Sequence, residues 1–194
     1  YSNGVEDDTA KWSRNSHYYG LGLTYEVGNL CLAGIVERFD NKSEEDKNKA
    51  TMVYSLSAAY DFEVAKAFFG YQYANRFHSL DQLEDVWVSG NGMNQNAFTL
   101  GAEVPAAGGT FKVAANYGFG KVRSADGVLV DYTKLSNDKF NRFTVGAAYE
   151  YPLSKRTFVY GWGAYATAGK MFKEKAVEEN FKSWSLGLGL HHNF

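Results

Sequence analysis

The chain has 194 residues, a net charge of −2 at pH 7 and 16% aromatic residues, with twenty glycines and two prolines. The near-neutral charge gives no basic surface for nucleic acid, and the single cysteine, Cys31, allows neither an internal disulfide nor a cysteine metal cluster. No apolar run approaches the roughly 20 residues of a membrane-spanning helix. The mean hydropathy of −0.39 does not exclude a membrane β-barrel, because only alternate residues of such a barrel face lipid.

Alternation of apolar and polar residues predicts nine antiparallel strands, so the expected fold class is all-β. Each strand is long enough to cross a bilayer obliquely, which takes about 9–11 residues. A tenth strand is represented by a stub at the start of the chain, "YSNGV". The nine strands are predicted at residues 17–27, 29–39, 51–62, 64–77, 96–106, 109–122, 140–152, 156–169 and 183–194.

The connections between these strands alternate in length. Tight turns alternate with long polar segments. The tight turns are "VGN", "DFEV", "AAGG" and "PLSKR". Short periplasmic turns and long external loops are the rule in outer-membrane barrels. We therefore expect a transmembrane antiparallel β-barrel whose long segments face the cell exterior. These segments are residues 40–50, 78–95, 123–139 and 170–182.

Most of the predicted strands have one apolar face and one small, polar face. In residues 140–152, Arg142 and Glu150 share one face, whereas Val145 and Tyr149 share the other. Isolated charges among glycine and alanine suit a water-filled lumen. Rings toward the ends of an apolar face suit lipid flanked by aromatic girdles.

One strand does not follow this pattern clearly. Residues 29–39 carry large apolar side chains on both faces, so the pattern does not fix their register. The stretch "YPLSKRTFVYGWGAYATAG", residues 151–169, interleaves large rings with glycine and alanine. We interpret its rings as facing lipid and its glycine-rich side as facing water.

Polar and charged residues on the predicted polar faces are candidates for lining the lumen, where they would tune which ions pass. They are Lys66, Gln72, Glu103, Lys112, Asn116, Arg142, Glu150 and His191. A hydrolase needs a nucleophile or water held by a positioned base, and the spacing of the four histidines supports no pairing with serine or aspartate. His191 and His192 are adjacent, point to opposite faces and cannot chelate one metal together. We expect no catalytic residue, metal or cofactor.

The strand count predicts that residues 1–194 are the C-terminal portion of a single, larger barrel domain. Bacterial single-chain barrels have an even number of strands because both ends lie in the periplasm. Counting back from the last strand makes the stub the upper end of an ascending strand, and five residues span only about 17 Å. The alternative is a complete ten-stranded barrel with a hydrolase or adhesive function carried by its loops.

The stretches "YPLSKRTFVYGWGAY" and "LGLGLHHNF" resemble the general porins of Gram-negative bacteria, in particular the trimeric β-proteobacterial branch. "HYYGLGLTYEVGNL" and "MVYSLSAAYDFEVAKAFFGYQYA" are similar to the middle of those porins, so the resemblance covers essentially the whole chain. It implies a sixteen-stranded barrel in the outer-membrane lipid, of which this chain forms about the last nine and a half strands. It also implies a homotrimer, a constriction made by an inward-folded loop facing basic wall residues, and passive diffusion of ions and small hydrophilic solutes.

The last strand resembles the C-terminal signal that the barrel-assembly machinery reads in outer-membrane proteins. The residues implied are Trp184, Leu186, Leu188, Leu190 and Phe194. One departure from the family is His191, where porins of this branch usually carry an arginine. Because histidine is mostly neutral at pH 7, a positive charge on the wall is weakened there. The inward-folded loop would lie upstream of Tyr1, so this sequence does not include it.

Overall fold

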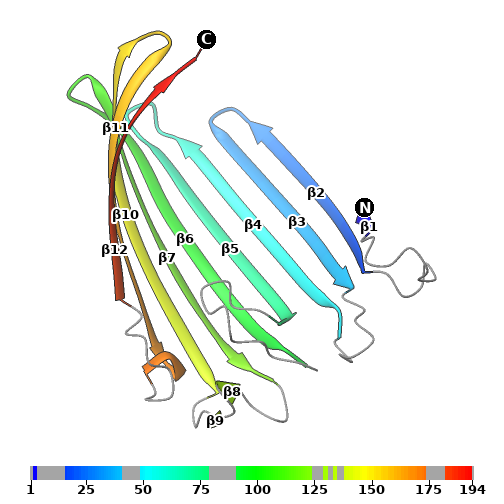
Figure 1. Ribbon diagram of the computed structural model, residues 1–194. Coiled ribbons are helices and arrows are strands. Elements are labelled where there is room, and N and C mark those ends of the chain that lie inside the picture. Colours follow the sequence, from blue (N-terminus) through cyan, green and yellow to red (C-terminus); the bar gives the residue numbers. More distant parts are fainter. Residues whose placement is uncertain are drawn as a thin grey trace.

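The computed structural model describes residues 2–3, 16–40, 49–78, 91–123, 129–130, 133–134, 138–173 and 182–193. In this part of the chain the backbone forms one antiparallel sheet of ten strands, ordered β1-β2-β3-β4-β5-β6-β7-β10-β11-β12 (Figure 1). A separate two-stranded hairpin, β8-β9, lies between β7 and β10 in the chain. No helix among the described residues is long and apolar enough to span a membrane.

All nine predicted strands are present. They are β2 (His17–Val27), β3 (Leu30–Asp40), β4 (Thr51–Asp61), β5 (Lys66–Phe77), β6 (Met93–Ala106), β7 (Gly109–Val122), β10 (Lys139–Ser154), β11 (Thr157–Lys170) and β12 (Lys182–His192). The short elements are β1 (Ser2–Asn3), which pairs with the start of β2, then β8 (Leu129–Val130), β9 (Thr133–Lys134) and the 3₁₀ helix η2 (Met171–Lys173). The main difference from expectation is β6, which begins at Met93 and takes in residues assigned above to a loop.

Short and long connections lie at opposite ends of the sheet (Figure 1). The β6–β7 turn consists of Ala107 and Gly108, both with positive φ, 50° and 78°. This is the sign pattern of a type I′ turn, whose twist matches that of the flanking strands. The structure thus confirms the predicted alternation of turn lengths.

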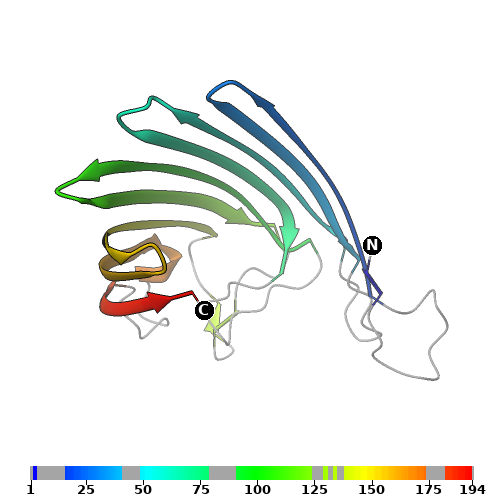
Figure 2. The same ribbon diagram turned by 90° about the horizontal axis from the view of Figure 1, so that it is seen from above.

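The sheet is curved throughout, and its two edges lie apart at the ends of the arc (Figure 2). Within the described residues, β12 pairs only with β11, and β2 pairs with β3 and the two residues of β1. The structure therefore shows a curved wall with two open sides.

The strand register assigns a face to each residue, because directly opposed residues of antiparallel strands point to the same side of the sheet. We call the side that carries Lys112 and Arg142 the polar face and the other the apolar face. Large side chains stand exposed on the apolar face, with Leu23 at 75% and Leu188 at 91% exposure. An apolar patch this extensive far exceeds that of a soluble monomer, and it suits contact with lipid.

The register also settles β3, which the sequence pattern left open. Cys31 pairs with Ala59 and Ile35 pairs with Ser55, so both lie on the polar face. Val36 pairs with Tyr54 on the apolar face. A large β-branched residue on the polar face is what obscured the alternation in this strand.

Fully buried side chains gather at the long-loop end of the polar face. Phe140 packs edge-on against Phe77 and against Phe172 of η2, with ring centroids 6.1 and 6.2 Å apart. Met93 and Met171 are also buried, at 0% and 1% exposure. The chain after β11 therefore folds over the polar face at this end, and the apolar packing there anchors it.

Candidate functional site: the polar face of the sheet

The structure brings all eight candidate lumen residues to the same face. Lys66 opposes Glu103, and Glu103 opposes Lys112, so a single row crosses three strands. The other candidates lie on the same side, as the residues opposite them on neighbouring strands show. These are Gln72 opposite Ala97, Asn116 opposite Thr144, Arg142 opposite Gly118, Glu150 opposite Thr110 and His191 opposite Phe158. That these residues line a lumen remains a prediction.

Five charged residues of alternating sign cross this face near the short-turn end, and we call them the charge row: Asp61, Lys66, Glu103, Lys112 and Glu150. The Nζ atom of Lys112 lies 2.9 Å from Oε2 of Glu150 and 3.7 Å from Oε1 of Glu103. The Nζ atom of Lys66 lies 5.5 Å from the centroid of the Phe68 ring. A pair of opposite charges on facing positions of two strands contributes about 0.2–1 kcal/mol to stability. The charge row therefore stabilises the strand register that brings its residues together.

Toward the middle of the strands the polar face carries amides and hydroxyls. Asn116 donates from Nδ2 to Oγ1 of Thr99 over 2.7 Å. Gln72 donates from Nε2 to Oγ of Ser55 over 3.2 Å. These bonds hold uncharged polar groups at fixed positions on a face that otherwise carries small side chains.

Three rings of β11 do not lie on the apolar face as the sequence suggested, so the interpretation was wrong for these three. Phe158, Tyr160 and Trp162 lie on the polar face, where Tyr160 opposes Glu150 and Trp162 opposes Ala148. A shift in register between Pro152 and Ser154 puts Tyr151 on the opposite side from these rings. Sequence reasoning treated the rings of this stretch as one set because it could not see that irregularity.

Glycines receive large side chains on both faces of the β11–β12 pair. A Cβ at Gly187 would overlap the indole of Trp162, and a Cβ at Gly189 would overlap the ring of Tyr160. On the apolar face the relation is reversed: Gly161 and Gly163 of β11 lie beneath leucines of β12. Complementary packing therefore fixes which side chains of β11 lie on the polar face.

The two C-terminal histidines have different surroundings. His191 lies on the polar face, its ring stacked on Phe158 at 4.8 Å between centroids, with Nε2 2.8 Å from Oδ1 of Asn193. His192 lies on the apolar face, with Nδ1 2.8 Å from Oγ1 of Thr157. Stacking and hydrogen bonding thus fix the orientation of the His191 ring on the polar face.

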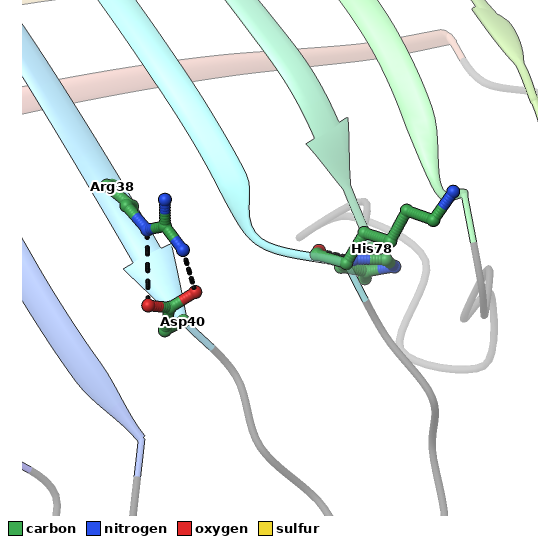
Figure 3. Close-up of polar contacts among 4 residues, drawn as sticks. Arg38, Asp40 and His78 are labelled. Carbon is green, nitrogen blue, oxygen red and sulfur yellow. Dashed lines mark hydrogen bonds and ion pairs between the residues drawn. The ribbon is translucent and has the colours of Figure 1, made fainter. Parts of the chain in front are cut away.

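The long-loop end of the apolar face carries a bidentate ion pair. Arg38 donates to Asp40 from Nε over 3.1 Å and from Nη2 over 2.8 Å (Figure 3). In the same view, Nε2 of His78 lies 3.0 Å from the backbone oxygen of Lys49 (Figure 3). The pair neutralises a charge that would otherwise stand alone at the edge of an apolar surface.

At the long-loop end of β7, Lys121 lies with its Nζ 3.0 Å from Oδ2 of Asp138, the residue before β10. This ammonium group holds the pKa of the Asp138 carboxyl below its usual range. Cys31 lies with its Sγ 3.9 Å from Oε1 of Glu26. Among the residues that the structure describes, no three histidine, cysteine, aspartate or glutamate side chains gather closely enough to hold a metal ion.

The residues implied as an assembly signal lie on the apolar face of β12, apart from one that falls outside the described residues. Trp184, Leu186, Leu188 and Leu190 are 75%, 73%, 91% and 63% exposed. Phe194 lies outside the described residues. The four described side chains form one continuous apolar strip along an edge strand of the sheet.

Solved structures with this fold are outer-membrane barrels. The anion-selective porin from Comamonas acidovorans matches with a TM-score of 0.59 at 21% identity, covering 91% of this chain and 49% of that one. A loop L8 deletion mutant of OmpT, an outer membrane protein of Vibrio cholerae, matches with a TM-score of 0.64 at 11% identity, covering 97% of this chain and 56% of that one. The sheet therefore has the architecture of an outer-membrane β-barrel wall.

The family follows from sequence. The model of the Gram-negative porin family matches residues 1–170, so the chain belongs to the Gram-negative porins, proteins of the outer membrane. It is 29% identical over 191 residues to an outer membrane porin protein of Bordetella pertussis. That alignment covers 89% of this chain and 45% of the relative, so the chain spans about half the length of the curated relative it matches.

Proposed function

We propose that this chain forms one side of a water-filled channel through which ions and small hydrophilic solutes diffuse passively. The observation that carries the proposal is the division of one curved sheet into two faces. Lys66, Glu103 and Lys112 stand with other charges on one side, and exposed leucines and rings stand on the other. Charges inside a large barrel are hydrated, whereas the apolar face matches acyl chains.

In this proposal the two open sides of the sheet are closed by further strands of the same domain, giving a sixteen-stranded barrel. The chain spans 45% of its Bordetella relative and 49% of the Comamonas porin, which fits a portion of a larger barrel. The long connections would face the exterior and the short turns the periplasm. Protease added to intact cells should then cut within residues 123–139 and spare Lys155 in the β10–β11 turn, whereas the reverse pattern would invert the orientation.

The proposal has three further parts. The protein would assemble as a homotrimer, be recognised by the barrel-assembly machinery through β12 and Phe194, and transport without catalysis. No observation on the described residues favours the alternative, a complete ten-stranded barrel with hydrolase or adhesive loops. Chemical cross-linking of the folded protein tests the trimer, and deletion of Phe194 tests the signal through loss of outer-membrane insertion.

Planar-bilayer recording of the complete protein tests the proposed transport. We expect stepwise increases of ion current without any substrate or energy source. A folded barrel that inserts and yet gives no current steps would contradict the proposal, and it would reopen the hydrolase and adhesive alternatives.

A further inference from the structure

A groove with a floor of small residues runs across the polar face from β5 to β11. The row next to the charge row, toward the long-loop end, reads Gly101, Ala114, Gly146 and Ala164 on four successive strands. These residues line a hollow of about 500 Å³. Because none has a side chain larger than a methyl group, the floor is smooth and apolar.

The two banks of this groove are polar in different ways. On the short-turn side stand Glu103 and Lys112 of the charge row. On the long-loop side stand Thr99, Asn116 and Thr144, which occupy one row on three neighbouring strands. Hydrogen-bonding groups therefore border the apolar floor along both of its long sides.

Aromatic rings mark the two ends of the groove. Phe68 lies in the floor row on β5, where it opposes Gly101. Trp162 lies on β11 beside Ala148, and its side chain is 40% exposed. Four strand spacings separate these rings, which is about 19 Å along the wall. That length accommodates two or three sugar rings.

The charges beside the groove favour an uncharged ligand. Lys112 lies between two carboxylates, and Lys66 opposes both Glu103 and Asp61. Alternating signs at neighbouring positions leave a single net negative charge on the five residues of the row, so at a distance the row attracts ions only weakly. At contact the same groups remain donors and acceptors for hydroxyls.

We propose that this groove is a binding subsite for neutral sugars on the wall of the channel. The C–H faces of a pyranose ring pack against Trp162 and Phe68, and its hydroxyls bond to the two polar banks. The inference rests on the proposed channel function and gives it a solute class. Contact with a partly exposed ring and a few hydroxyl partners corresponds to weak binding, as suits a solute that must also leave.

Titration of the ion current with maltotriose tests this subsite in the complete protein. We expect millimolar maltotriose to reduce the open-channel current, with a half-blocking concentration unchanged between 0.1 and 1 M KCl because the sugar is neutral. Loss of one stacked ring in Trp162→Leu should raise that concentration about threefold to tenfold. Phe68→Leu should act in the same direction.

The matched controls lie on the same strands and face the other way. Phe69 adjoins Phe68 on the apolar face, and Tyr165 is the exposed ring on the apolar face of β11. Phe69→Leu and Tyr165→Leu should leave sugar block unchanged. If Trp162→Leu does not fold, Asn116→Ala and Thr144→Val probe the opposite bank and should weaken block in the same way.

The outcomes separate this inference from the function on which it rests. Absence of ion current would contradict the channel itself. Normal current that maltotriose does not reduce, even at about 100 mM, would overturn the sugar subsite alone. Block by benzoate or by a zwitterionic dipeptide, with none by maltotriose, would also overturn it and assign the groove to another solute class.

Discussion

Lys112 of β7 and Glu150 of β10 form an ion pair of 2.9 Å on the polar face, and Glu103 approaches the same ammonium group at 3.7 Å. The three side chains are each about one-third exposed, so water reaches them. Such pairs contribute little to stability, about 0–1 kcal/mol. Their consequence for a channel is the local field, because each charge acts on passing ions.

Removing one charge from this group should therefore change ion selectivity in a direction that its sign decides. Lys112→Met leaves two carboxylates without their shared cation and should shift the reversal potential in a KCl gradient toward cation preference. Glu150→Gln should shift it the opposite way. Shifts of the same sign in both variants, or none in either, would place these residues outside the ion path.

A second prediction follows from the positions of Arg142 and Ala147 on opposite faces of β10. Arg142→Ala should leave folding nearly intact and shift selectivity toward cations, because one positive charge leaves the polar face. Ala147→Arg should instead impair membrane insertion, since a charge facing lipid at mid-depth costs about 2–4 kcal/mol. Heat-modifiable mobility of the folded barrel and its reversal potential check the two variants. A harmless Ala147→Arg beside an unaltered Arg142→Ala would contradict the face assignment.

The packing of Trp162 over Gly187 makes a third prediction. Gly187→Ala forces the indole to move and should lower the free energy of unfolding by about 1–3 kcal/mol, the usual cost of overpacking. In a Trp162→Ala background the same substitution should cost almost nothing. Urea unfolding in lipid vesicles measures both, with Ser185→Ala on the same face as the control. If Gly187→Ala lowers the free energy of unfolding equally in the two backgrounds, the contact between Trp162 and Gly187 does not cause the loss.

A fourth prediction concerns Asp138, whose pKa the neighbouring Lys121 holds below the usual range. A carboxyl group with a depressed pKa in the folded state stabilises that state above its unfolded pKa. The contribution is lost as the pH falls through the folded pKa. Lys121→Met should return the Asp138 pKa upward, as NMR titration of the carboxyl would measure. High salt should shrink the difference between the two proteins, because the pair is exposed.

The strands, their order and the alternation of turn lengths could be predicted from sequence because each depends on local patterns. Period-two alternation marks a strand, and short turns leave an antiparallel neighbour as the only partner within reach. The faces of β10, β7 and β12 followed in the same way. In these strands one side is mostly apolar and includes the large rings, and the other is mostly small or charged.

The faces of β3 and β11 could not be predicted, and the reason is physical. Ile35 stands on the polar face of β3, and Trp162 stands on that of β11, so neither strand has a purely small inner side. The glycines of β12 are covered by rings of β11, the neighbouring strand. Because the two strands are separated in the sequence, the pattern of one strand alone does not reveal this packing. The groove between Phe68 and Trp162 depends on the register of five strands, which no single stretch of sequence contains.

The central claim is that the polar face borders water and the apolar face borders lipid, and two adjacent residues test it most directly. In a Cys31→Ser background, Asn116→Cys places a thiol on the polar face and Ala115→Cys places one on the apolar face. A membrane-impermeant, charged methanethiosulfonate reagent is added during bilayer recording of the complete protein. The account predicts a stepwise change of conductance with the thiol at position 116 and none with the thiol at position 115. Modification at 115 but not at 116, in a channel that conducts, would contradict it.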